Sequence, residues 1–200
     1  MAQPVIVKIG GSVANERSRL RALLRDLADA APGGIVVVPG GGVFADAVRE
    51  AQCRLGFDDG LAHRLALDAM SAMAQAFRAL EPRLRMADDL TAIRRAWRGG
   101  AVPVWQAAAL RDGHPDIQES WDVTSDSLAV WLATQLGAER CVLVKSSMAA
   151  PEGTPARWAR SGLVDAAFPR FAAAFGGEVL IHGTDSGDIG AALAAPAVAA

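Results

Sequence analysis

Short runs of consecutive apolar residues, rich in valine and isoleucine, alternate along the chain with longer alanine-rich segments. The apolar runs predict five strands, at residues 5–9, 35–38, 102–105, 141–144 and 179–181. Apolar positions three and four residues apart predict helices at 18–31, 43–55, 61–80, 91–98, 123–136 and 164–175. Because the strands are continuously apolar, both faces of the sheet are expected to be covered. This pattern predicts an α/β fold, a three-layer αβα sandwich with a mainly parallel central sheet.

Length and composition are those of one ordered domain. The chain has 200 residues, of which 52% are hydrophobic and 21% are charged. This apolar content excludes intrinsic disorder as the main state, and domains commonly have about 100–200 residues. We expect residues 1–200 to form a single domain. Segment 146–155 is a candidate mobile loop, and the alanine-rich tail after Gly190 is expected to be frayed or peripheral.

Charge and cysteine content exclude several kinds of partner. The 20 Lys and Arg residues nearly balance the 22 Asp and Glu residues, so no overall positive field attracts nucleic acid or anionic lipid. Cys53 and Cys141 lack the spacing of a zinc site or a disulfide framework. No segment approaches the roughly 20 apolar residues that cross a bilayer. We expect a cytoplasmic protein that binds neither nucleic acid nor membrane, and we assign no residue to a metal site.

The first predicted strand carries Lys8 near its end and is followed by Gly10, Gly11 and Ser12. Glycines permit close backbone approach, exposed amides can cradle an anion, and a lysine adds a point charge. The turn is therefore a candidate phosphate cradle. A tight strand-to-helix turn with an incidental lysine explains the same residues equally well.

A second glycine turn, at residues 40–42, follows the second strand and opens onto a helix. Two such turns can face one another across a crevice at the carboxyl ends of parallel strands. A donor phosphate and an acceptor group would then share one site.

The second turn also fits a different class of protein. Gly40, Gly42 and Ala45 match the dinucleotide pattern G-x-G-x-x-A, with Asp58 or Asp59 near the position of the ribose-binding acid. No apolar strand leads to either acid, and the first glycine turn has no role in this interpretation. An NAD-binding dehydrogenase is therefore the weaker alternative.

Lys8 and Lys145 are the only lysines in the chain, and Lys145 follows the fourth predicted strand. Two lysines that converge from different strands supply the positive charge that a breaking phosphate bond requires. Asp126, in the first turn of the helix predicted before that strand, is a candidate to orient them or a metal-bound phosphate. The alternative for Lys145 is a solvated position at the end of a strand. The alternative for Asp126 is that its charge only complements the helix dipole, while Asp122 or Thr124 caps the helix.

In this order and spacing, four elements resemble the amino acid kinase family, whose members include acetylglutamate kinase, uridylate kinase and isopentenyl phosphate kinase. They are the two glycine turns, the helix start that carries Asp126 and the strand that ends at Lys145. The family pattern is matched by the K-x-G-G-S stretch at 8–12, the glycine turn at 40–42 and, in looser form, the helix start at 125–129. The resemblance extends from residue 5 to about 189. Within the family, stretches 62–70, 121–127 and 162–165 are most similar to the methanofuran-biosynthesis kinases, which phosphorylate aminomethylfuran-methyl phosphate, and to their relatives in methylotrophic bacteria.

The resemblance implies a role for each site residue. The catalytic residues would be Lys8, Asp126 and Lys145, with Asp126 as the organiser of the two lysines. The nucleotide would be bound by Gly10, Gly11, Ser12 and Lys145. The acceptor would be bound by Gly40, Gly41, Gly42, Asp59 and His63. His63 would bind the acceptor phosphate, and Asp59 would meet a substrate amine. For both residues a structural or surface role is the alternative. The implied cofactors are ATP and Mg²⁺, and the implied assembly is a homo-oligomer.

These observations predict an ATP-dependent kinase that converts a small phosphate monoester to a diphosphate. The N-terminal part would hold the acceptor and the C-terminal part the nucleotide. Segments 146–151 and 183–189 depart from the family pattern, which leaves the nucleotide preference open. The alternative outside the enzymes is a non-catalytic protein of the same fold that binds a nucleotide or an oxyanion.

Overall fold

The computed structural model describes residues 4–30, 34–146, 153–184, 186 and 188–194. Its centre is a sheet of six strands in the order β3-β4-β2-β1-β5-β6. The strands are β1 (Val5–Ile9), β2 (Ile35–Pro39), β3 (Arg85–Ala87), β4 (Pro103–Trp105), β5 (Arg140–Val144) and β6 (Glu178–His182). Every pairing between them is parallel. Because β1 pairs with both β2 and β5, the carboxyl ends of these three strands meet at one edge.

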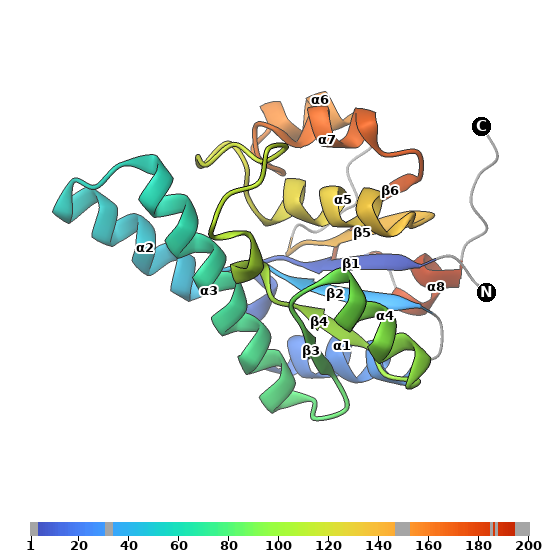
Figure 1. Cartoon of the computed structure of the whole chain (residues 1–200). Coiled ribbons are helices and arrows are strands. Elements are labelled where there is room, and N and C mark those ends of the chain that lie inside the picture. Colours follow the sequence, from blue (N-terminus) through green and yellow to red (C-terminus); the bar gives the residue numbers. More distant parts are fainter. Residues whose placement is uncertain (1–3, 31–33, 147–152, 185, 187, 195–200) are drawn as a thin grey trace.

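Helices cover both faces of the sheet (Figure 1). They are α1 (Arg17–Asp29), α2 (Gly42–Leu55), α3 (Asp59–Leu80), α4 (Leu90–Arg98), α5 (Ser125–Leu136), α6 (Pro155–Arg160), α7 (Phe168–Ala174) and α8 (Ile189–Ala194), with the 3-10 turns η1 (Val13–Asn15) and η2 (Ala107–Leu110). Alternate residues of β1 lie in two hydrophobic cores. Ile6 packs on the side of α4, α5, α6 and α7, whereas Val5 and Val7 pack on the side of α1 and α8. The expected three layers and parallel sheet are confirmed.

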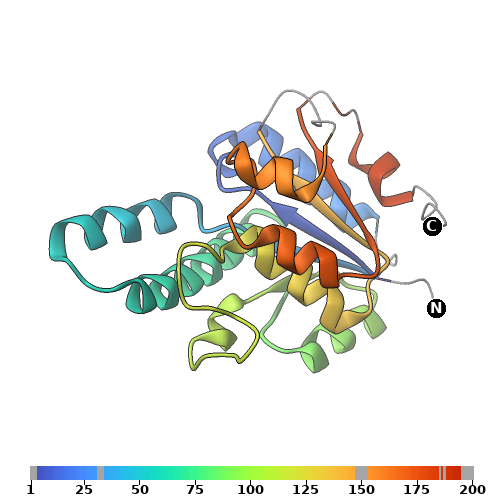
Figure 2. The same ribbon diagram turned by 90° about the horizontal axis from the view of Figure 1, so that it is seen from above.

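Helices α2 and α3 form a hairpin that projects from the body of the molecule (Figures 1 and 2). Helix α2 ends at Gly56, whose φ of 74° lies in the left-handed region that favours glycine. Asp58 then caps α3 by accepting a hydrogen bond from the Leu61 backbone N–H at 2.8 Å. The half of α3 nearer the body lies against the sheet and contributes to both cores, with Leu67 in one and Phe77 in the other.

The hydrophobic pattern located five strands and missed β3. This strand has three residues at the sheet edge, of which Arg85 is exposed, so it carries no apolar run. The short helices α6 and α8 were also missed. The expectation of a helix over 164–175 was too long, because α7 begins at Phe168, after Val164 enters the core.

Two expectations about irregular segments have separate outcomes. Most of the proposed mobile loop at 146–155, namely residues 147–152, lies outside the described residues, whereas Thr154 caps α6 and Pro155 begins it. The tail after Gly190 is helical as far as Ala194, and the Arg140 guanidinium donates to the carbonyls of Ala192 and Leu193 at 3.4 and 3.3 Å. That part of the tail is therefore not frayed. No helix in the described ranges has both the length and the apolar character required to span a membrane.

Candidate functional site

The two glycine turns lie against each other at the carboxyl edge of the sheet. The Gly10 N–H donates to the Val144 carbonyl at 2.9 Å, and the Gly40 N–H donates to the Ile9 carbonyl at 2.8 Å. A Cβ on Gly11 would lie 2.7 Å from the Cα of Gly42, which is closer than any side chain tolerates. The absence of side chains thus allows the two turns to touch, as the glycine-turn hypothesis requires.

The turns differ in how they lead into the next helix. Helix α2 begins directly at Gly42, with Gly41 at its N-cap. After the first turn, η1 intervenes and α1 begins only at Arg17. The Ser12 hydroxyl instead accepts a hydrogen bond from the Ser146 hydroxyl at 2.8 Å. The first turn is therefore connected to the end of β5.

Lys8, Asp126 and Lys145 form a buried cluster beside the turns. The Lys8 ammonium lies 2.8 Å from Oδ1 of Asp126, and the Lys145 ammonium lies 2.7 and 2.8 Å from its Oδ1 and Oδ2. The three residues are between 3% and 9% exposed. A Cβ on Gly10 would lie 3.8 Å from the Lys8 ammonium and 3.7 Å from Cδ of Lys145, so Gly10 lies close to both. The interpretation of Asp126 as a mere complement to the helix dipole is wrong, because its carboxylate joins Lys8 on β1 to Lys145, which directly follows β5.

The charges of this cluster alter one another. Burial raises the pKa of Asp126, but the two ammonium groups outweigh this effect and hold the pKa below its usual value. Burial and the nearby Lys8 ammonium lower the pKa of Lys145 to about 8. Asp126 is therefore an anion that holds two cations, and it is a poor proton acceptor.

Asp165 fixes the beginning of helix α5, on which Asp126 lies. Its Oδ2 accepts from the backbone N–H and the hydroxyl of Thr124 at 2.9 and 2.8 Å, and from the Ser127 N–H at 3.0 Å. Its Oδ1 accepts from the Ser127 hydroxyl. Thr124 occupies the N-cap position without making a side-chain cap. The cap that the sequence assigned to Asp122 or Thr124 thus comes from Asp165, whose own pKa is raised by burial.

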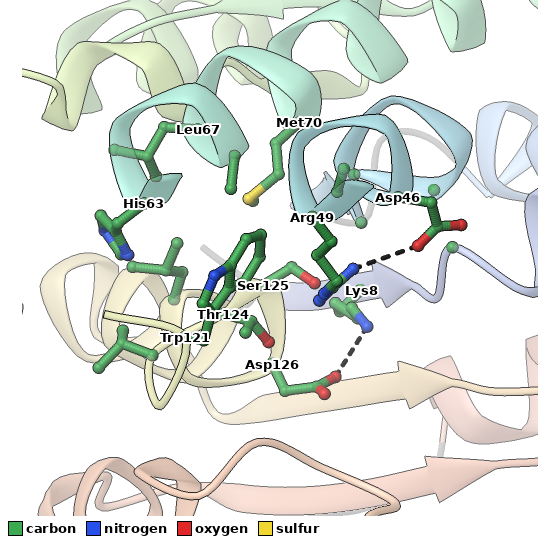
Figure 3. A pocket seen from close by; sticks show the side chains of 18 of the residues that line it. Lys8, Asp46, Arg49, His63, Leu67, Met70, Trp121, Thr124, Ser125 and Asp126 are labelled. Atoms are coloured by element: carbon green, nitrogen blue, oxygen red, sulfur yellow. Dashed lines mark hydrogen bonds and ion pairs between the residues drawn. The ribbon is translucent and has the colours of Figure 1, made fainter. Parts of the chain in front are cut away.

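Two cavities meet at the lysine–aspartate cluster (Figure 3 shows the first). The first has a volume of about 330 Å³. Its polar lining includes Lys8, Asp126, Gly11 and residues 40–42, and its apolar lining includes Leu67, Met70 and Val123. Gly10 lines neither cavity. The second has a volume of about 570 Å³ and is lined by Lys145, Ser146 and residues 162–165. The residues common to both are Ser12, Arg49, Trp121, Thr124 and Asp126. The arrangement therefore provides two adjacent compartments with cations where they join.

His63 lines the first cavity and is only 3% exposed. Its Nδ1 lies 3.1 Å from the Ser120 carbonyl oxygen. Since a carbonyl only accepts, Nδ1 must carry the proton. Its buried Nε2 has no hydrogen-bond partner among the described residues. Such an atom is costly to leave unpaired, which favours a ligand at this position.

Asp59 does not join the other expected site residues. It lies at the first position of α3, outside the lining of either cavity, and its Oδ1 accepts a hydrogen bond from Nε2 of Gln52 at 2.8 Å. We therefore withdraw it as a contact for a substrate amine. The neighbouring Asp58 is the cap of α3. Neither acid follows a strand, as a ribose-binding acid does in a dinucleotide fold, so the dehydrogenase alternative fails.

The described residues contain no group of three or more His, Cys, Asp or Glu side chains that could hold a metal ion. Both carboxylate oxygens of Asp126 already accept from Lys145. These residues do not build a cage for Mg²⁺. A magnesium ion at this site would need most of its ligands from phosphate and water.

Sequence reasoning missed Arg49 and Trp121, which line both cavities, and Gln52, which supports Trp121 through a 2.7 Å hydrogen bond. Arg49 stands seven residues after Gly42, on the same face of α2. That spacing was a usable signal. Trp121 lies in the stretch compared with the methanofuran-biosynthesis kinases, but nothing local connects it to α2.

A family model described as the amino acid kinase family matches residues 3–147. A [5-(aminomethyl)furan-3-yl]methyl phosphate kinase of Methanocaldococcus jannaschii is 27% identical over 138 residues, which are 69% of this chain and 63% of that protein. The match thus spans less than two thirds of that relative.

Solved structures of kinases share the fold. The uridylate kinase of Archaeoglobus fulgidus superposes with a TM-score of 0.72 at 15% identity and covers 98% of this chain and 97% of its own. The UMP kinase of Ureaplasma parvum has a TM-score of 0.67 at 14% identity and covers 92% and 91%. The aspartate kinase of Synechocystis has a TM-score of 0.64 at 14% identity and covers 92% and 38%.

Proposed function

The chain belongs to the amino acid kinase family, and from this premise we propose that it is an ATP-dependent kinase whose acceptor is a small phosphate monoester. The product would be a diphosphate. The observation that carries the proposal is the buried Lys8–Asp126–Lys145 cluster where two cavities meet. Aminomethylfuran-methyl phosphate is the proposed acceptor, because a 27% identical relative is named as the kinase for that compound.

The proposed division of the site follows the two linings. The acceptor would occupy the first cavity, where the second glycine turn and His63 lie, and the donor phosphates would occupy the second, beside Lys145. Lys8 would lie between them, with Gly10, Gly11 and Ser12 beneath the phosphates. The expectation of an acceptor-side N-terminal part and a nucleotide-side C-terminal part stays a prediction.

Positioning and charge neutralisation would supply most of the catalysis. The acceptor phosphate is already an anion near neutral pH, so its attack on the donor phosphorus needs no general base. Asp126 is unsuited to that role, because two ammonium groups hold its carboxylate as an anion. Instead it would keep both lysines directed at the bond that breaks. No covalent intermediate with the enzyme is required.

His63 is proposed to bind the acceptor phosphate through Nε2. This atom is buried and has no partner among the described residues, and His63 lines the first cavity. Because Nδ1 is held by the Ser120 carbonyl, Nε2 is the ring atom that remains to contact the acceptor.

Mg²⁺ is proposed to accompany ATP, bound mainly by phosphate oxygens and water. Bound there, it would neutralise part of the phosphate charge. The cytoplasmic location and the homo-oligomer remain predictions. Sedimentation velocity of the purified chain tests the second, and a monomer at all concentrations would contradict it.

The direct test is acceptor-dependent release of ADP from magnesium ATP, measured with a panel of phosphate monoesters that includes aminomethylfuran-methyl phosphate. Lys8→Met retains the apolar stem and removes the charge. We expect it to lower kcat by about 100-fold or more, because one charge-stabilising contact of the transition state is lost. Circular dichroism confirms that the variant is folded.

Two results would contradict the proposal. Normal turnover by folded Lys8→Met would remove Lys8 from the chemistry. Nucleotide binding by the wild-type chain without acceptor-dependent ADP release would favour the alternative, a non-catalytic nucleotide-binding protein.

A further inference from the structure

Arg49 lies where the two cavities join. Among the described residues that line either cavity, the only lysines and arginines are Lys8, Lys145 and Arg49. Lys8 lines the first cavity and Lys145 the second, whereas Arg49 lines both. Figure 3 shows its side chain, which extends from α2 and pairs with Asp46. Its position thus gives it access to a group bound at the junction.

A stacking contact holds the Arg49 guanidinium in place. Its Cζ lies 4.3 Å from the centroid of the Trp121 ring. Stacking uses the face of the guanidinium plane and leaves the N–H groups at its edge free to donate. The edge is therefore available to an anion while the face stays on the ring.

The ring that supports Arg49 is itself fixed. The Trp121 indole N–H donates to Oε1 of Gln52 at 2.7 Å. The amide nitrogen of Gln52 donates to Oδ1 of Asp59 at 2.8 Å, which orients the amide oxygen toward the indole. This chain of contacts gives Asp59 an indirect part in the site.

The present partner of Arg49 is one that a phosphate can replace. Its guanidinium lies 3.2 Å from Oδ1 of Asp46, one turn earlier on α2. The side chains of Arg49 and Asp46 are 52% and 70% exposed. Ion pairs so open to water contribute little to stability. A phosphate dianion, which accepts two parallel N–H bonds from one guanidinium, competes well for the same group.

The charge of the buried cluster is small beside that of the ligands. Lys8 and Lys145 share the single negative charge of Asp126, which leaves about one positive charge for the ligands. An acceptor phosphate and the donor phosphates together bring several negative charges to the same place. In addition to the Mg²⁺ proposed to accompany ATP, a guanidinium at the junction would reduce the repulsion between these phosphates as the acceptor approaches.

We propose that Arg49 binds the phosphate of the acceptor at this junction and so selects a phosphate monoester over a neutral alcohol. The inference rests on the proposed kinase function. Arg49 belongs to the acceptor side because α2 begins at the second glycine turn, and it reaches the junction where that phosphate must meet the donor.

Steady-state kinetics with magnesium ATP and aminomethylfuran-methyl phosphate test the inference. Arg49→Gln is expected to raise the acceptor KM by about 10- to 100-fold, the range expected for a lost charged hydrogen bond. The KM for ATP should change by less than about 3-fold. Arg49→Lys keeps the charge but loses the planar fork, so its acceptor KM should fall between those of wild type and Arg49→Gln.

Arg54 provides a matched control on the same helix. It also pairs with a carboxylate one turn earlier, Glu50, and it is exposed, but it lines neither cavity. Arg54→Gln should leave both KM values unchanged. Equal effects of Arg54→Gln and Arg49→Gln would reduce the role of Arg49 to general surface charge and overturn the inference.

A binding measurement separates this inference from the proposed function. Calorimetry with inorganic pyrophosphate needs no turnover, and we expect Arg49→Gln to bind it at least about 10-fold more weakly than wild type and Arg54→Gln. If the wild-type chain releases no ADP with any acceptor, the kinase proposal fails and this measurement still decides whether Arg49 binds phosphate. Pyrophosphate affinity and acceptor KM both unchanged in Arg49→Gln would overturn the inference.

Discussion

Lys145 carries its positive charge in surroundings that oppose it. Burial and the Lys8 ammonium lower the pKa of Lys145 to about 8, although the Asp126 carboxylate acts in the opposite direction. Below this pH the side chain is a cation that attracts phosphate. Above it the side chain becomes a neutral amine. The charge on which the proposed donor site depends is therefore lost in weakly alkaline solution.

We expect the affinity for ADP to fall as the pH rises through about 8. Titration calorimetry in buffers on both sides of this pH measures the change. Lys145→Arg is the comparison, because a guanidinium with a pKa above about 12 stays charged throughout the series. Identical pH profiles for wild type and Lys145→Arg would show that another group controls binding.

The same pKa shift acts on stability with the opposite sign. The ordinary pKa of lysine is 10.5, so between pH 8 and 10.5 the unfolded chain holds a proton at Lys145 that the folded chain has released. The contribution of Lys145 to the free energy of unfolding therefore rises with pH across this window. Below pH 8 both states are protonated, and the full cost of burying the charge remains.

The sequence indicated the two lysines but not Arg49, because lysine and arginine differ in how often and where they occur in this chain. Lysine is rare in this chain, and both copies stand at the ends of apolar strands. Arg49 is one of many arginines, and its helical spacing from Gly42 is shared by ordinary surface residues. Its contact with Trp121, far along the chain, and its place in the lining of both cavities distinguish it, and both arise only in the folded chain.

Among the elements, helix α5 depends on a residue from outside itself. Asp165, which precedes α7, binds the backbone N–H groups of Thr124 and Ser127. These N–H groups lie at the beginning of α5, where backbone N–H groups have no acceptor within the helix itself. The cap also fixes the direction of the turn that carries Asp126. A loop that lines the second cavity thus holds the central carboxylate of the site.

We expect Asp165→Ala to lower the free energy of unfolding by about 1–3 kcal/mol, since two partly buried N–H groups and two hydroxyls lose their acceptor. Turnover should fall as well, because Asp126 is no longer held between the lysines. Urea denaturation and the kinase assay measure the two effects.

Asp89→Ala is the matched control. Asp89 caps α4 by accepting from the Ala92 N–H at 2.6 Å, and it lines neither cavity. Its loss should cost about 1 kcal/mol of stability and leave turnover unchanged. An Asp165→Ala variant with normal kcat would mean that the cap of α5 contributes to stability alone.

The predicted and observed helices differ most around this cap. The helical period suggested one helix over 164–175, yet Asp165 turns away to cap α5 and α7 begins at Phe168. Periodicity measures only spacing along the chain. It contains no information about a carboxylate that serves a different helix 38 residues away.

At the scale of the whole molecule, the parallel sheet brings the carboxyl ends of β1, β2 and β5 to one edge, where the α2–α3 hairpin closes the first cavity (Figures 1 and 3). Residues from the first, middle and later parts of the chain line the two cavities. A ligand that spans these parts binds only the folded chain. Its binding should therefore stabilise the fold as a whole.

We expect ADP at about 100 times its Kd to stabilise the folded chain by about 2.7 kcal/mol and to raise the melting temperature by roughly 5–10 °C. Differential scanning fluorimetry measures this shift. Adenosine, which lacks phosphates, should give a much smaller shift at the same concentration, because the charged lining recognises phosphate. Equal shifts with adenosine and ADP would indicate a site that binds the base instead.

The amino-acid pattern alone determined the layers of the fold, the positions of five strands and the two glycine turns, and it indicated Lys8, Lys145 and Asp126 through their place in those elements. These features are local, since strand burial, helical period and glycine turns depend on neighbouring residues. The tertiary structure decided that Asp126 binds both lysines, that Asp165 caps α5, that Asp59 lies outside the cavities and that Arg49 rests on Trp121. Such contacts join residues far apart in the chain, and they exist only after the strand order has brought those segments to the same edge.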